Sequence, residues 1–162
     1  MFITLTEVPI SRCELTLFAD YFQFYIQDEK VDGNLSDAWT DEAVGRLLAV
    51  ASGTVGIGTV RNVAVPITIV VLEREPMLEA SKFDHVVECS IAVECGAIVV
   101  AGCTDYFPDA VRIKIPSGPY RVRASFEGLD SVSPDGLGGN DQYHLQLWPA
   151  PMRSVEILKQ RT

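Results

Sequence analysis

Residues 111–126 have the sequence VRIKIPSGPYRVRASF, and this stretch decides the fold class. Apolar and polar side chains alternate on both sides of Pro116-Ser117-Gly118-Pro119, a pattern typical of two strands around a tight turn. Segments 111–115 and 120–126 are therefore predicted to form a β-hairpin. One face of it would line the core through Val111, Ile113, Ile115, Tyr120, Val122, Ala124 and Phe126.

The same two-residue period recurs along most of the chain. In the first strand region the apolar positions change parity near Asp20–Tyr21, from Leu17 to Phe22 and Phe24, which indicates a bulge or bend. Further strands are predicted at 54–59, 63–72, 84–93, 97–101, 143–148 and 155–158. This series of short strands predicts a mainly β fold, a two-layer antiparallel β-sandwich with one short α-helix. A length of 162 residues predicts a single domain over 1–162.

One helix is predicted from residue 41 onward. Thr40 can cap its first turn, where Asp41 and Glu42 complement the helix dipole. An apolar stripe follows, made of Val44, Leu47, Leu48 and Ala51. Gly53 would end the helix. A helix this short is marginal alone, so we expect it to dock on the sheet.

The composition is that of a globular protein, with 48% apolar and 22% charged residues. No apolar run reaches the roughly 20 residues that a membrane-spanning helix needs. The opening MFITLTEVPISRC lacks a basic region followed by a continuous apolar region, so no secretory signal is expected. We therefore expect a cytoplasmic protein whose four cysteines are reduced.

The net charge of −9 disfavours nucleic acid as a partner, because phosphate binding requires a positive surface. It favours a basic protein partner, although for charge alone the simpler explanation is that acidity keeps the protein soluble. Between residues 14 and 42 the only base is Lys30, and the acids are Glu14, Asp20, Asp28, Glu29, Asp32, Asp37, Asp41 and Glu42.

Basic residues gather on the predicted hairpin. If the two strands pair, Lys114 opposes Arg121 and Arg112 opposes Arg123, and such like-charge pairs are destabilising. An anionic group should therefore lie nearby. It belongs either to an acidic neighbour in this chain, such as the region 14–29, or to a partner.

No motif predicts catalysis or a cofactor. His85 and His144 are the only histidines, and no cysteine spacing matches a zinc or catalytic signature. An enzyme is therefore not expected. The loop 128–141 is the alternative site: Asp130, Asp135 and Asp141 could ligate calcium in a ligand-binding sandwich, but ordinary turn chemistry explains them as well.

Four short motifs resemble the ComJ-like family of competence proteins, which are acidic inhibitors of a DNA-entry nuclease. They are Tyr21-Phe22-Gln23-Phe24, Asp37-Ala38-Trp39-Thr40-Asp41-Glu42-Ala43, Arg61-Asn62 and Pro116-Ser117-Gly118-Pro119-Tyr120. The resemblance covers roughly residues 21–123. It implies a protein-binding domain without enzymatic activity, whose partner is a basic protein of the nuclease type.

The resemblance also implies where a partner would bind. Trp39 would be the aromatic anchor, with Asp37, Asp41 and Glu42 as its charge partners. Arg61 and Asn62 belong to the same set because their motif recurs in the family. Three of these residues have a plainer alternative: Trp39 could pack the helix onto the sheet, and Asp41 and Glu42 could simply cap the helix.

Overall fold

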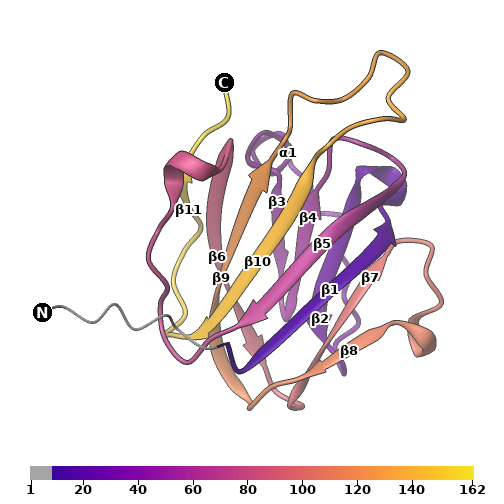
Figure 1. The fold of residues 1–162 in the computed structure, drawn as a ribbon. Coiled ribbons are helices and arrows are strands. Elements are labelled where there is room, and N and C mark those ends of the chain that lie inside the picture. The colour runs from indigo at the N-terminus through magenta and orange to yellow at the C-terminus, as the bar shows by residue number, and fades with distance from the viewer. Residues whose placement is uncertain (1–8) are drawn as a thin grey trace, which may run out of the picture.

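The computed structural model describes residues 9–162, which form two β-sheets packed face to face around one core (Figure 1). The six-stranded sheet has the order β1 (Ser11–Phe18), β5 (Ala64–Val71), β10 (Gln142–Pro149), β9 (Gly118–Glu127), β6 (His85–Val93), β11 (Glu156–Lys159). The five-stranded sheet has the order β3 (Leu48–Ala51), β4 (Thr54–Gly58), β2 (Gln23–Asp28), β7 (Ala97–Gly102), β8 (Val111–Lys114).

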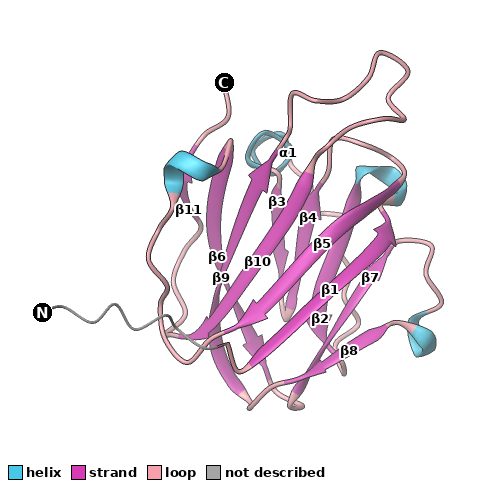
Figure 2. Cartoon of the chain, viewed as in Figure 1, coloured by secondary structure: helices cyan, strands magenta, loops and turns pink. Residues whose placement is uncertain are grey.

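Helical structure is confined to short pieces at the ends of strands (Figure 2). They are the helix α1 (Asp41–Arg46) and the 3-10 turns η1 (Asp20–Phe22), η2 (Ala80–Lys82) and η3 (Phe107–Asp109). No helix within residues 9–162 is long and apolar enough to cross a lipid bilayer. The predicted mainly β sandwich with one short helix is therefore confirmed.

One strand pair departs from the predicted antiparallel arrangement. β10 runs parallel to β5, with Tyr143 opposite Ile67 and Leu147 opposite Val71. β10 also pairs with β9 on its other side, in the antiparallel sense. It therefore lies between two strands that precede it in the chain, and the six-stranded sheet is mixed.

The parity change near Asp20 marks a passage between the two sheets rather than a bulge. β1 lies in the six-stranded sheet and β2 in the five-stranded sheet, with η1 between them. Phe24 is fully buried, as predicted. Phe22, which was predicted to face the core, is instead 52% exposed, because the turn directs it outward.

The predicted hairpin of residues 111–126 is wrong, although its strands exist. β8 pairs with β7 in the five-stranded sheet, whereas β9 pairs with β6 and β10 in the six-stranded sheet. The turn at Pro116 therefore carries the chain from one sheet to the other. Most of the predicted core face is buried: Ile113, Ile115, Tyr120, Val122, Ala124 and Phe126, whereas Val111 is 39% exposed.

The helix begins where predicted and ends early. The Thr40 hydroxyl accepts a hydrogen bond from the Ala43 amide at 3.2 Å, which caps the first turn. The helix ends at Leu47, whose left-handed backbone has φ 59°. Leu48 then starts β3, and Gly53 lies in the turn between β3 and β4 rather than at a helix end. Local pairing with β4 thus prevails over the helical period of residues 47–51.

Candidate partner-binding site

Trp39 packs on the outer face of the five-stranded sheet, at the end of the segment 31–39. Its indole lies against Gly56 of β4 so closely that a Cβ there would come within 2.9 Å of Cζ2. Its Nε1–H donates a hydrogen bond to Gln23 Oε1 at 2.8 Å. The half-buried Trp39 joins a small apolar cluster with Leu35 and Ala43. The packing role proposed for Trp39 is therefore real, and it fixes the orientation of the indole.

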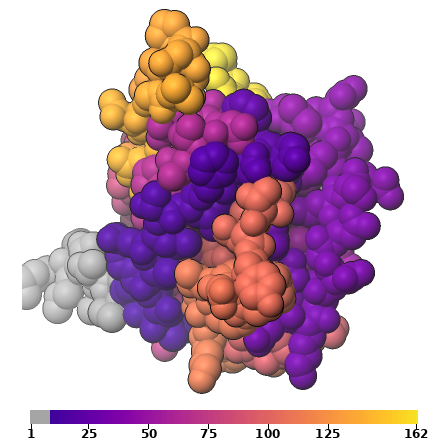
Figure 3. Space-filling view, turned by 90° about the vertical axis from the view of Figure 1, so that its right-hand side faces the viewer, coloured from indigo at the N-terminus to yellow at the C-terminus, as the bar shows by residue number. Residues whose placement is uncertain are grey.

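An open hollow of about 300 Å³ lies beside Trp39, and we call it the aromatic hollow. Its lining comes from η1, β2, α1 and β4: Tyr21, Phe22, Gln23, Trp39, Val44, Leu47, Gly58 and Thr59. The segments that build it adjoin on one face of the molecule, η1 in indigo and residues 31–58 in purple (Figure 3). Three large apolar side chains in this lining are largely exposed: Tyr21 (70%), Phe22 (52%) and Val44 (58%).

The backbone that presents Tyr21 and Phe22 is strained. Both residues have left-handed dihedral angles, with φ 60° at Tyr21 and φ 57° at Phe22. For a residue with a Cβ this conformation costs on the order of 1 kcal/mol, and glycine avoids the cost. Two consecutive aromatic residues in this conformation are therefore an outlier. Strain of this kind concentrates at functional sites.

Exposed acids lie close in sequence to the residues that line the aromatic hollow. Asp41 and Glu42 occupy the first turn of α1, one turn before Val44, and Asp37 lies two residues before Trp39. We call Asp37, Asp41 and Glu42 the acidic rim. Asp41 and Glu42 also complement the helix dipole, so the capping role proposed for them is compatible with a role in binding.

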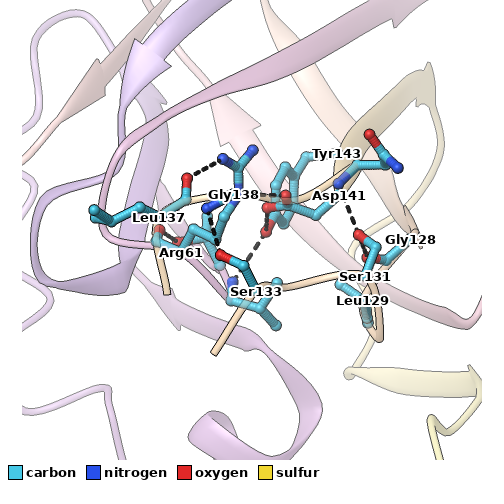
Figure 4. A network of polar contacts seen from close by, with 12 residues as sticks. Arg61, Gly128, Leu129, Ser131, Ser133, Leu137, Gly138, Asp141 and Tyr143 are labelled. Carbon is cyan, nitrogen blue, oxygen red and sulfur yellow. Dashed lines mark hydrogen bonds and ion pairs between the residues drawn. The ribbon is translucent and has the colours of Figure 1, made fainter. Parts of the chain in front are cut away.

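Arg61 lies apart from the acidic rim and serves a different purpose. It is 8% exposed, and its Nε donates to Asp141 Oδ1 at 2.5 Å while Nη1 donates to the Leu137 carbonyl at 2.9 Å. The Tyr143 hydroxyl donates to the other Asp141 oxygen at 2.6 Å (Figure 4). Arg61 thus anchors the long loop 128–141. Asn62 is exposed.

The aspartates of the long loop make contacts within the chain. Asp141 is fully buried and already bound by Arg61 and Tyr143, and Asp135 accepts hydrogen bonds from Ser133 and Leu137 within its own turn. Asp130 faces Arg161 at 3.7 Å. Within residues 9–162, no group of three or more His, Cys, Asp or Glu side chains could hold a metal ion. These residues therefore shape the loop.

The clustered arginines find their counter-ions inside the chain. Arg112 binds Glu29 at 2.9 Å, as the intramolecular alternative predicted for the acidic segment. Arg121 and Arg123 both bind Glu88 of β6, at 3.0 and 2.8 Å, and all three side chains are at least 95% buried. Nothing in the sequence indicates that Glu88 is this counter-ion, because Glu88 lies in a strand more than thirty residues from either arginine.

His85 and three of the cysteines have surroundings that do not favour nucleophilic chemistry. The buried His85 accepts a hydrogen bond from the Arg161 amide at Nδ1, so its Nε2–H donates to the Arg46 carbonyl, 2.7 Å away. Both imidazole nitrogens are thus occupied. Burial raises the pKa of Cys89 to about 12 and raises the pKa of Cys13 and Cys103. These thiols therefore stay protonated and unreactive near neutral pH.

Comparison with solved structures places this architecture among known folds. The crystal structure of ComJ from Bacillus subtilis, an inhibitor of the DNA-degrading activity of NucA, superposes with a TM-score of 0.66 and 19% identity. The match covers 90% of this chain and 99% of ComJ. The fold is similar to that of ComJ. The resemblance inferred from the sequence motifs is thus confirmed at the level of the fold.

A second solved structure has the same architecture. The protein of crocagin biosynthetic gene J superposes with a TM-score of 0.61 and 18% identity, over 87% of this chain and 98% of its own. No family model matches the chain, and neither does any curated protein. The ComJ fold therefore occurs in proteins named for different processes, so function has to be argued from the surface of this chain.

Proposed function

We propose that this protein is a non-enzymatic inhibitor that binds a basic protein of the DNA-degrading nuclease type. The aromatic hollow would receive an apolar side chain of the partner, and the acidic rim would face its basic surface. The observation that carries the proposal is the strained pair Tyr21 and Phe22, which exposes two aromatic rings beside Trp39. The ComJ-like fold and the cytoplasmic location expected from the sequence support it.

The chemistry of the surface fits such a partner. A nuclease presents basic groups to DNA phosphates. An acidic protein whose carboxylates bind these basic groups keeps DNA from binding there. Aromatic side chains in a desolvated centre supply most of the binding energy in protein interfaces, while rim charges mainly set the association rate and its salt dependence. The hollow and the acidic rim correspond to these two parts.

The first test is inhibition of the NucA-type nuclease encoded by the source organism, with DNA degradation as the readout. We expect one-to-one inhibition that weakens as salt is raised, because rim charges are screened. The double variant Asp37→Asn/Glu42→Gln should slow association by about tenfold. The matched variant Glu73→Gln/Asp130→Asn, which neutralises two exposed acids elsewhere, should inhibit like the wild type. Equal inhibition by all three proteins, or none, contradicts the proposal.

The second test measures the backbone strain at Tyr21 through the melting temperature of the protein. Tyr21→Gly should raise the melting temperature by about 2–4 °C, because glycine relieves about 1 kcal/mol of left-handed strain in a chain of this size. It should also weaken inhibition, since an exposed ring of the hollow is lost. Tyr106→Gly is the matched control: Tyr106 is equally exposed at 71% but has φ −73°, so glycine should lower the melting temperature. A lowered melting temperature for Tyr21→Gly contradicts the strain argument.

A further inference from the structure

A second cavity lies on the opposite side of the molecule, over the outer face of the six-stranded sheet. Its volume is about 530 Å³, within the range of sites for small molecules. The floor consists of outward side chains from four neighbouring strands, in register with one another. One cross-strand row is Thr68, His144 and Ser125, and the next row is Arg12, Val70, Gln146 and Arg123.

Three polar side chains on this floor make no hydrogen bond within the described part of the chain. Ser125 is 3% exposed, yet within residues 9–162 no hydrogen bond involves its hydroxyl, the Thr68 hydroxyl or the Gln146 amide. The His144 Nε2 is buried and lies 3.5 Å from Glu127. Buried polar groups are normally hydrogen-bonded. The Ser125 hydroxyl, in a residue that is almost fully buried, is therefore the group most in need of a partner.

The lining of this cavity contains positive groups, not all of which are neutralised. Arg12, Lys82 and Arg123 line it together with the acid Glu79, and Arg12 is paired with Glu14 at 2.7 Å while Arg123 is paired with Glu88. Arg123 is held rigidly: Nε binds Glu88 and Nη1 donates to the Pro76 carbonyl, whereas Nη2 has only the distant Glu75 at 3.8 Å. One guanidinium donor therefore remains for an anion. Lys82 and this edge of Arg123 are the positive groups that remain for a ligand.

The roof of the cavity is the segment 73–83, which connects β5 to β6 and which we call the strap. It runs along the edge of the six-stranded sheet that carries β6 and β11 (Figure 1). Arg123 fastens its first half, and Lys159 Nζ donates to the Ala80 carbonyl at 3.0 Å in its second half. Its apolar side chains Met77, Leu78 and Phe83 also line the cavity. The strap thus supplies an apolar wall above a polar, cationic floor.

We infer that the cavity between the strap and the six-stranded sheet binds a small organic anion with an apolar portion. The anionic group would lie near Lys82 and the free edge of Arg123, with Gln146 and Ser125 as hydrogen-bond donors. The apolar portion would contact Met77 and Phe83. This inference does not depend on the proposed function, because the aromatic hollow lies on the outer face of the other sheet.

The test uses two fluorescent probes that differ in charge. The anion 1-anilinonaphthalene-8-sulfonate should bind one per protein with enhanced fluorescence, and the neutral N-phenyl-1-naphthylamine should bind at least tenfold more weakly. Lys82→Glu, at an exposed position that the fold does not need, should weaken binding of the anionic probe at least fivefold. Lys114→Glu makes the same charge change at an exposed position of β8 in the other sheet and should leave binding unchanged.

A third variant tests whether the anionic probe binds at the aromatic hollow instead. Phe22→Ser alters the aromatic hollow and should not change binding of the anionic probe. Loss of binding in Phe22→Ser overturns the inference, as does equal weakening by Lys82→Glu and Lys114→Glu. Equal affinity for the charged and neutral probes overturns it as well, because the cavity would then not recognise an anion. None of these results bears on nuclease inhibition, so the two proposals fail separately.

Discussion

Glu88→Gln should destabilise the protein by about 3–5 kcal/mol, the range found when one partner of a buried ion pair is removed. Glu88 is 1% exposed and holds Arg121 and Arg123, which are 0% and 4% exposed. The amide keeps the shape but leaves the buried Arg121 without a counter-ion, and it leaves the buried Arg123 with only Glu75 at 3.8 Å. Urea unfolding monitored by tryptophan fluorescence measures the loss.

Two further variants make this expectation specific. Glu29→Gln is the same change in the half-exposed pair with Arg112, and it should cost less than about 1 kcal/mol. The triple variant Glu88→Leu/Arg121→Met/Arg123→Met removes all three charges and should recover much of the stability lost in Glu88→Gln. If Glu88→Gln costs no more than Glu29→Gln, the buried network does not hold the sheet face as described.

Asp141→Ala should cost a similar amount, about 3–5 kcal/mol, because it leaves the buried Arg61 unpaired. It also removes the acceptor of the Tyr143 hydroxyl, 2.6 Å away. The second expected effect is local: the loop 128–141 loses the contact that anchors its end. Limited proteolysis should therefore cut the variant within this loop at protease concentrations that leave the wild type intact.

The control lies in the same loop. Asp130 faces Arg161 at 3.7 Å but is 86% exposed, so Asp130→Ala should change stability by no more than about 0.5 kcal/mol. It should also leave the proteolysis pattern unchanged. Cleavage in the loop of both variants at equal rates would show that the buried pair with Arg61 does not anchor it.

The sequence predicted those features that depend on neighbours along the chain. The Thr40 cap needs only the next three residues, and the alternation of Phe24 and Ile26 needs only one strand. Both are confirmed. The turn at Tyr21 was located as well, as a bulge or bend, although the passage from one sheet to the other was not foreseen. Its left-handed backbone could not be predicted, since aromatic residues rarely adopt that conformation.

Features that depend on distant partners were missed. The turn at Pro116–Pro119 signals a reversal of the chain but does not specify which strand pairs with which, so β8 and β9 were paired with each other instead of with β7 and β6. The helix was extended through Ala51 to a stop at Gly53, because the competing partner of this segment, β4, lies beyond the local pattern. In the candidate site, Trp39 was found but the hollow beside it was not, since that requires four separate elements.

The position of β10 has a consequence for how the protein is made in the cell. Residues 142–149 fill the gap between β5 and β9, so a nascent chain has no complete six-stranded sheet until β10 and then β11 have left the ribosome. Until then β5 and β9 present unpaired edges, which are the templates for aggregation. Truncations that remove β10 should therefore yield insoluble protein rather than a smaller sandwich, and overproduction should create a demand for chaperones.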